Sequence, residues 1–162
     1  QDVGGHFPER LRMSVAVIYN TADRLYTRYT EVDAAALAEE LSKTDLVVGY
    51  NLLGFDYPVL QKYAPGVDLA QLPTLDMMLE VQKRLGFRLK LDMLATATLQ
   101  SGKSADGLQA VQWWREGRID ELFEYCRQDV EVTYKLYEFG KQNRFLQYFD
   151  RQYKLKRVPV AW

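Results

Sequence analysis

The chain has little of several residue types, and each scarcity argues against a class of function. Its 162 residues include one cysteine, Cys126, which excludes an intramolecular disulfide. Its single histidine, His6, argues against a histidine-rich zinc site and against a serine–histidine triad. No apolar run approaches the roughly 20 residues that cross a bilayer, and no segment resembles a signal peptide. We therefore expect a soluble, cytoplasmic protein that has no membrane partner.

The chain also has almost no net charge. It carries 21 Lys and Arg residues against 22 Asp and Glu residues, which leaves a net charge of −1. Such a balance attracts neither nucleic acid nor an anionic membrane globally, so a polyanion must be held by a local basic patch or by metal ions. With 48% hydrophobic residues the chain can bury a full core. We predict a single domain over residues 1–162.

The order of the predicted strands and helices indicates an α/β fold. The Tyr- and Thr-rich segment 25–30 follows a turn cluster at 20–23, so it is predicted to form an antiparallel hairpin with the alternating segment before it. Further strands then alternate with helices, an order typical of a mixed sheet of hairpin and parallel strands flanked by helices. From Leu91 onward the patterns predict only helices, followed by an aromatic and basic tail. The predicted strands cover 11–19, 25–30, 46–48 and 72–77, and the predicted helices cover 34–43, a segment from Asp56 to before Pro65, 78–85, 91–99, 107–115 and 119–139.

The stretch 45–60 combines a strand, a polar turn and the start of a helix. Leu46–Val48 is aliphatic and β-branched, as expected of a strand that is covered on both faces. Asn51, Phe55 and Asp56 follow it, at the carboxyl end of the strand, where open α/β sheets place their functional sites. Asp56 is therefore either a functional carboxylate or simply the cap of its helix.

A second carboxylate lies inside the long predicted helix 119–139. Tyr125, Asp129, Val132 and Leu136 are spaced by four, three and four residues, so they share one helix face. Asp is unfavourable in mid-helix, and a buried carboxylate needs a partner, commonly a cation or a metal ion. The alternative is that Asp129 faces solvent and Tyr125 lies at the edge of the core.

These two segments carry a resemblance to a known family. Asn51-Leu-Leu-Gly-Phe55-Asp56 resembles the second motif, and Tyr125-Cys-Arg-Gln-Asp129 the third motif, of the metal-dependent 3′–5′ exonucleases with a ribonuclease H-like fold. The tyrosine in the third motif is typical of a subgroup similar to the proofreading domains of family B DNA polymerases. The order of the motifs along the chain also matches the family.

The resemblance implies a ribonuclease H-like mixed sheet and a set of site residues. Asp56 and Asp129 would be metal ligands for Mg²⁺ or Mn²⁺ and, with Tyr125, would form the catalytic set. Tyr125 would orient the attacking water, and Asn51 and Phe55 would position the terminal nucleotide of a single-stranded 3′ end. Whether the strand is DNA or RNA stays open, because recognition of the 2′-hydroxyl has no motif here.

One part of the family pattern has no counterpart in this sequence. The first motif, Asp-x-Glu on the central strand of the sheet, does not occur in a strand context before Asn51. We expect that this N-terminal central strand is missing, either because the chain begins just after it, which we favour, or because the protein has lost it. The sheet would then close up, borrow a strand or form a homo-oligomer through an exposed edge. With two carboxylates we expect a weak or inactive nuclease.

Two other hypotheses compete with the interpretation of this chain as an enzyme. The first is a non-catalytic nucleic-acid-binding or protein-interaction module on the same fold. The second is an α/β domain whose motif match is accidental, which would be favoured if the four polar motif residues did not converge in one cleft.

A third carboxylate, the single cysteine and two basic stretches are the other notable features of the sequence. Asp76, at the end of a predicted strand, either approaches the metal site or, as we favour, caps the helix that follows. Cys126 is interpreted as a small buried apolar residue. Two basic stretches either follow a nucleic-acid backbone or are simply solvated surface: Lys83, Arg84, Arg88 and Lys90, and Arg151, Lys154, Lys156 and Arg157.

Overall fold

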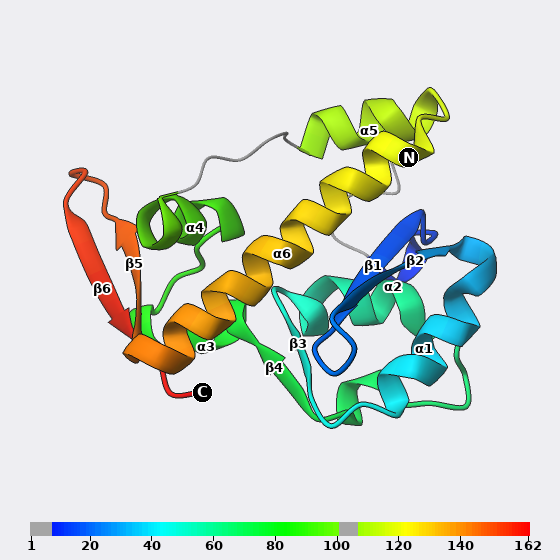
Figure 1. The fold of residues 1–162 in the computed structure, drawn as a ribbon, viewed down its shortest axis with the longest axis horizontal. Helices are drawn as coiled ribbons and strands as arrows, with labels where there is room; N and C mark the ends of the chain where they lie inside the picture. The colour runs from blue at the N-terminus through cyan, green and yellow to red at the C-terminus, as the bar shows by residue number, and fades with distance from the viewer. Residues whose placement is uncertain (1–7, 101–106) are drawn as a thin grey trace.

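Three pairs of strands, surrounded by helices, make up the computed structural model, which describes residues 8–100 and 107–162 (Figure 1). Two pairs are antiparallel hairpins and the third is parallel, so the predicted α/β class is confirmed. Within these residues the pairs are not hydrogen-bonded to one another, and the predicted mixed sheet is present as separate pieces. The pairs are β1 (Val15–Asn20) with β2 (Leu25–Thr30), β3 (Val47–Gly49) with β4 (Thr74–Asp76), and β5 (Phe145–Phe149) with β6 (Leu155–Pro159).

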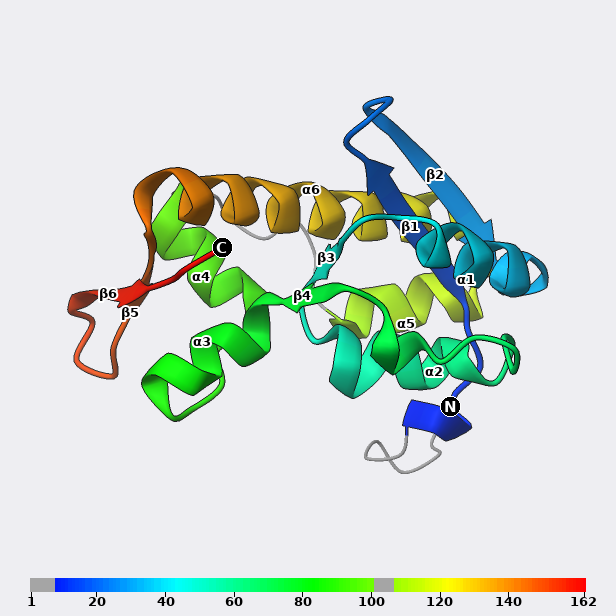
Figure 2. The ribbon, with the colours of Figure 1, turned by 90° about the horizontal axis from the view of Figure 1, so that it is seen from below.

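The helices lie close to their predicted positions. The longest, α6, runs across the whole molecule and lies beside β1, β3, α4, α5 and β5 (Figures 1 and 2). None of the helices in the described residues is long and apolar enough to cross a membrane. The helices are α1 (Ala34–Ser42), α2 (Tyr57–Gln61), α3 (Met77–Leu85), α4 (Leu91–Leu99), α5 (Gly107–Arg115) and α6 (Ile119–Asn143), with short turns at η1 (Pro8–Arg10), η2 (Glu31–Asp33), η3 (Leu52–Asp56) and η4 (Leu69–Gln71).

The prediction of an all-helical C-terminal half is wrong, because the tail forms the β5–β6 hairpin. Leu146 and Val158 lie opposite each other in its register and are both fully buried. The Asp150 carboxylate closes the turn by accepting hydrogen bonds from the backbone N–H groups of Gln152 and Lys154, at 2.8 and 2.9 Å.

The strands β3 and β4 separate two hydrophobic clusters. Val47 packs against the first cluster and its neighbour Val48 against the second. Because successive strand residues point to opposite faces, the strand is covered on both sides, as predicted. The first cluster contains Met13, Ala34, Leu37, Ala38, Tyr57, Leu60, Ala64 and Leu69, and the second contains Met77, Val81, Leu89, Leu94, Ala95, Leu136, Leu146, Val158 and Val160.

Glu31 fastens the segment before β1 to the end of α2. Its carboxylate accepts hydrogen bonds from the Arg12 guanidinium at 2.9 and 2.5 Å and from the Tyr63 hydroxyl at 2.7 Å. The hydrogen bonds from Arg12 and then Tyr63 lower the pKa of Glu31 to about 2. Tyr63 in turn accepts a hydrogen bond from the backbone N–H of Met13 at 3.2 Å. The ionised form of Glu31 therefore favours the folded state.

A Glu31→Gln variant is expected to unfold at a lower temperature than the wild type at pH 7. Since the folded-state pKa lies below the ordinary value of 4.5, the stabilisation is complete above pH 4.5 and is lost as the pH falls towards 2. Thermal unfolding of both proteins from pH 2 to pH 7 should therefore show two curves that converge at the acid end. Glu39→Gln, which breaks only an exposed ion pair with Lys43, is the matched control. A constant gap across this range would contradict the prediction.

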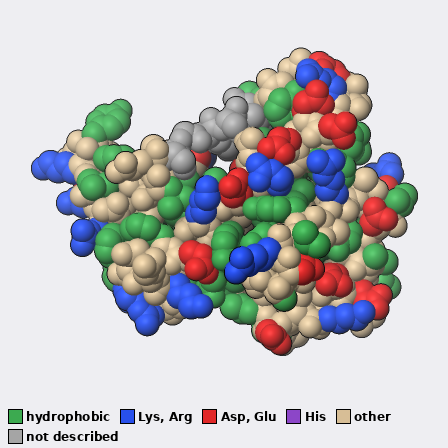
Figure 3. Space-filling model, viewed as in Figure 1, with side chains coloured by type: hydrophobic (Ala, Val, Ile, Leu, Met, Phe, Trp, Pro, Cys, Tyr) green, Lys and Arg blue, Asp and Glu red, His purple; other side chains and the backbone are tan. Residues whose placement is uncertain are grey.

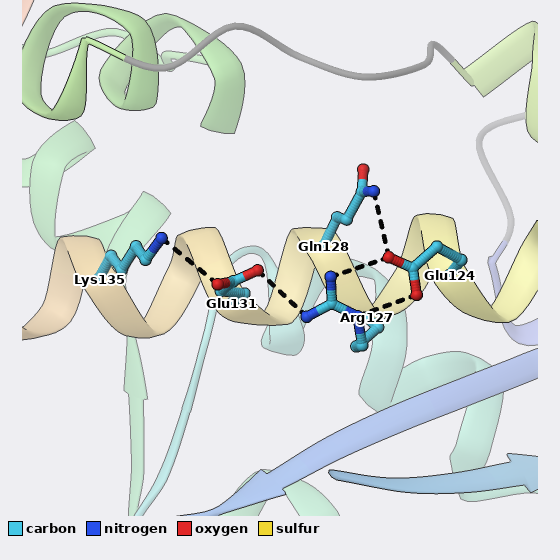
Figure 4. Close-up of polar contacts among 5 residues, drawn as sticks. All are labelled: Glu124, Arg127, Gln128, Glu131 and Lys135. Carbon is cyan, nitrogen blue, oxygen red and sulfur yellow. Dashed lines mark hydrogen bonds and ion pairs between the residues drawn. The ribbon is translucent and has the colours of Figure 1, made fainter.

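The outer face of α6 carries a connected line of charged groups (Figure 4). The Arg127 guanidinium donates to Glu124 at 2.9 and 2.8 Å and to Glu131 at 3.1 Å. Lys135 pairs with Glu131 at 3.3 Å, and the Gln128 amide donates to Glu124 at 3.2 Å. Arg127 and Gln128 therefore take part in this surface line, although they belong to the segment that resembles the third exonuclease motif.

Candidate functional site

The chain leaves β3 through a tight turn that presents Asn51 and Asp56. Asn51 has φ 64° and ψ 36°, in the left-handed region that Asn tolerates better than most residues. Leu52–Asp56 then forms a single π-helical turn that leads directly into α2. Turns of this kind are rare in proteins, and many of those known lie at functional sites. The sequence patterns predicted a helix only from Asp56 onward and missed this turn.

Asp76 holds this turn in place from the neighbouring strand. It is 4% exposed, and its carboxylate accepts hydrogen bonds from the backbone N–H groups of Asn51 at 2.8 Å and Leu53 at 3.0 Å. It makes no side-chain hydrogen bond to the helix that follows it, so the favoured prediction of a helix cap is wrong. The parallel register explains this position, because Asp76 lies opposite Gly49, two residues before Asn51.

The side chain of Asn51 is folded over Gly54. A Cβ atom at position 54 would collide with the Asn51 amide oxygen, so this turn requires a glycine there. The same oxygen is buried and has no hydrogen-bond partner among the described residues. Buried acceptors without a partner are uncommon in folded proteins. Asn51 Oδ1 is therefore a group that a bound ligand could satisfy.

Asp56 and Asp129 come from separate segments, and the charges of both act on Cys126. The thiol of Cys126, one turn before Asp129 on α6, has its pKa raised to about 11, first by burial and then by the charges of Asp129 and Asp56. The helix α6 also lies beside β3, the strand that leads into the turn with Asp56. Cys126 is partly buried, whereas the sequence predicted a fully buried small apolar residue.

Asp56 lies in crowded but solvent-accessible surroundings. Burial raises the pKa of its carboxyl to about 7, and the charge of Asp76 adds to the shift. The residue is nevertheless exposed to solvent by surface area. A cation bound there would compensate the poorly solvated negative charge.

Two aromatic side chains flank the carboxylates. The Tyr125 ring lies one turn before Asp129 and packs edge-on against Trp113 of α5, with ring centroids 6.3 Å apart. The Phe55 ring, next to Asp56, is 46% exposed. On the predicted face that Tyr125 and Asp129 share with Leu136, Leu136 is fully buried, and Tyr125 and Asp129 are partly buried.

Asp56 and Asp129 are the two motif carboxylates that could hold a divalent cation. Across residues 8–100 and 107–162, no three His, Cys, Asp or Glu side chains form a group that could hold a metal ion. His6 lies outside these ranges. Asp56 and Asp129 supply two carboxylates, and Mg²⁺ is commonly bound through one or two carboxylates, with water and substrate phosphate completing its shell. The described residues alone do not supply the ligands of a two-metal site.

Comparison with known families agrees with this geometry. Residues 12–139 match the model of a family described as the RNase H superfamily, and the match covers most of the chain. The chain therefore belongs to the RNase H superfamily, and the predicted ribonuclease H-like fold is confirmed. A search of the curated proteins found no match. The exonuclease subgroup and the kinship with family B polymerases stay predictions.

Proposed function

We propose that the protein is a metal-dependent 3′–5′ exonuclease domain that hydrolyses phosphodiester bonds at the single-stranded 3′ end of a nucleic acid. The observation that supports the proposal is that α6, which carries Tyr125 and Asp129, lies beside β3, the strand that leads into the turn with Asp56. Membership of the RNase H superfamily supports a nuclease-type domain.

The residues take the following roles in this proposal. Asp56 and Asp129 hold Mg²⁺ or Mn²⁺, which when bound would activate a water molecule and stabilise the leaving oxygen. Tyr125 orients the attacking water through its hydroxyl group. Phe55 stacks against the terminal base with its exposed ring, and Asn51 accepts a hydrogen bond from the same nucleotide through its unpartnered amide oxygen.

The number of carboxylates limits the activity we expect from the 162-residue chain. Two ligands hold one cation, whereas phosphodiester cleavage by two-metal sites stabilises both the attacking and the leaving oxygen. We therefore expect weak or no cleavage by this chain alone. A version to which a strand with an Asp-x-Glu pair is joined before residue 1, called here the extended protein, is expected to be active.

Digestion of a 5′-labelled single strand tests this proposal. The extended protein should shorten the strand progressively from its 3′ end in Mg²⁺ or Mn²⁺, and excess EDTA should abolish the reaction. A duplex with two blunt ends and a strand with a blocked 3′ end are the matched substrate controls. Internal cuts without 3′ shortening would contradict the exonuclease assignment, and a strand that keeps its full length with Mg²⁺ and with Mn²⁺ would contradict nuclease function.

A non-catalytic nucleic-acid-binding or protein-interaction module is the second candidate. It is favoured by the small number of carboxylates that converge in the described residues. It predicts metal-independent binding that weakens with salt, and no cleavage even by the extended protein. In this case a homo-oligomer through a sheet edge is the proposed assembly, which sedimentation equilibrium would detect as a multiple of the 18.9 kDa chain mass.

A further inference from the structure

One end of the molecule is rich in Lys and Arg, although the whole chain is nearly neutral. The two basic stretches at 83–90 and 150–157 contain eight Lys and Arg side chains and one carboxylate, Asp150. That carboxylate is engaged by the backbone N–H groups of its own turn. All eight cations are exposed. We call this surface the basic end, and its cations are Lys83, Arg84, Arg88, Lys90, Arg151, Lys154, Lys156 and Arg157.

The two stretches lie side by side because they share one core. Val81 and Leu89 belong to the same buried cluster as Leu146 of β5 and Val158 of β6. The segment between α3 and α4 also reaches the hairpin through Phe87, whose ring packs edge-on against Tyr148 with centroids 6.2 Å apart. Blue side chains gather at this end in the space-filling view, over the β5–β6 hairpin and α3 (Figure 3).

Most of these cations are free of ion pairs within the described residues. Lys83 pairs with Glu80 at 3.0 Å, whereas the four hairpin cations form no ion pair in the described part of the chain. On α6, by contrast, Arg127 and Lys135 form ion pairs with neighbouring carboxylates. The basic end therefore keeps a field that can attract an anionic polymer.

Apolar rings lie exposed among the same cations. Phe149 is 44% exposed and faces Leu155, which is 52% exposed, across the hairpin register. Tyr153, in the turn between the strands, is 89% exposed. The Arg157 guanidinium lies over the Phe145 ring, 4.1 Å from its centroid. A merely solvated charged surface has no need of exposed rings, whereas rings among cations are the combination that binds single strands by stacking and by phosphate contact.

We propose that the basic end binds single-stranded nucleic acid through the exposed face of the β5–β6 hairpin, and so holds the strand whose 3′ end the carboxylate site receives. The proposal rests on the proposed function for the identity of the polymer. Asp129 lies 14 residues before the end of α6, which is about 20 Å of helix. The two sites are therefore separate.

Fluorescence anisotropy with a labelled 20-nucleotide single strand in EDTA tests the proposal on the 162-residue chain. A Phe149→Ala/Tyr153→Ala variant is expected to bind at least about thirtyfold more weakly, because it loses two stacking rings at about 1–3 kcal/mol each. A Lys154→Ala/Lys156→Ala variant should reduce the slope of log affinity against log salt by about 1.4, at about 0.7 for each lost phosphate contact. Lys43→Ala and Lys135→Ala, whose side chains are paired with Glu39 and Glu131, are the matched controls and should bind like the wild type.

The outcomes separate this inference from the nuclease proposal. Wild-type affinity in both hairpin variants would overturn the inference, whatever the extended protein cleaves. Weaker binding of the variants together with an inactive extended protein would support the inference and overturn the nuclease proposal. Binding of the chain to phosphatidylserine vesicles without binding to the strand would overturn the inference in favour of a membrane surface.

Discussion

An Asp56→Asn variant is expected to bind Mn²⁺ at least tenfold more weakly than the wild type and, at pH 8, to be more stable in the absence of metal. The two effects have one cause, which is the poor solvation of the Asp56 carboxylate. Burial and the charge of Asp76 raise its pKa to about 7, so the metal-free protein carries an uncompensated charge that a cation would stabilise. Loss of stability in exchange for function is common at functional sites.

The stability gain depends on pH in a defined direction. The folded-state pKa of about 7 lies above the ordinary value of 3.8, so the carboxyl binds a proton more tightly in the folded protein. Wild-type stability therefore falls as the pH rises from about 4 to about 7, and the variant gains relative to it over that window. A fully desolvated carboxylate with this shift would cost about 4 kcal/mol. Solvent reaches Asp56, so we expect a gain of only about 1 kcal/mol.

Metal binding should show the opposite dependence in the wild type. A proton and Mn²⁺ compete for the Asp56 carboxylate, so the Mn²⁺ affinity is expected to rise as the pH increases towards 7 and to level off above it. Electron paramagnetic resonance of free Mn²⁺ at several pH values measures this affinity. Asp129→Asn should also weaken binding at least tenfold, and in the extended protein either variant should lower the cleavage rate at least 100-fold, since a metal site contributes several kcal/mol.

Asp45→Asn is the matched control for the two substitutions. Asp45 is an exposed aspartate directly before β3, outside the turn that carries Asp56. The Asp45→Asn substitution should leave the Mn²⁺ affinity and the unfolding midpoint unchanged. If Asp56→Asn and Asp129→Asn also left Mn²⁺ binding unchanged, the assignment of these carboxylates as metal ligands would be wrong.

Sequence patterns located the motif residues well because their positions depend on local rules. The spacing of Tyr125, Asp129 and Leu136 follows the helical period, so the inward face of α6 was predictable from the sequence. Asp56 was placed between a buried strand and a helix, and the structure has it there. In each case the hydrophobic pattern of a single element contained the information.

The features that were missed depend on partners far away in the chain. The π-helical turn at Leu52–Asp56 is held by Asp76, which bonds to a backbone group 25 residues earlier. The β5–β6 hairpin has its outer edge satisfied by Thr98 of α4, whose hydroxyl exchanges hydrogen bonds with the backbone of Gln147 at 2.8 and 3.0 Å. No propensity of the local residues encodes such tertiary bonds. The unpartnered amide oxygen of Asn51 was likewise visible only in three dimensions.

Asp76→Ala is expected to lower the free energy of unfolding by about 3 kcal/mol. The substitution leaves the backbone N–H groups of Asn51 and Leu53 buried without an acceptor, which costs about 1–3 kcal/mol for each group. Urea unfolding at pH 7 measures the loss, and Asp68→Ala, at an exposed position before η4, should cost less than about 0.5 kcal/mol. Asp76→Asn should lie between them, because its amide keeps one acceptor oxygen.

The same substitution connects the stability of the turn to the chemistry of the site. Asp76 raises the pKa of Asp56 by its charge, so Asp76→Asn should move the Asp56 pKa downward and shift the pH window of Mn²⁺ binding to lower pH. A purely structural residue would change the unfolding free energy without moving that window. If the pH window of Mn²⁺ binding stayed in place while the free energy of unfolding fell, Asp76 would act on the site only through its hydrogen bonds to the backbone of Asn51 and Leu53. If both changed, its buried carboxylate would also set the proton affinity of the group that we propose binds the metal ion.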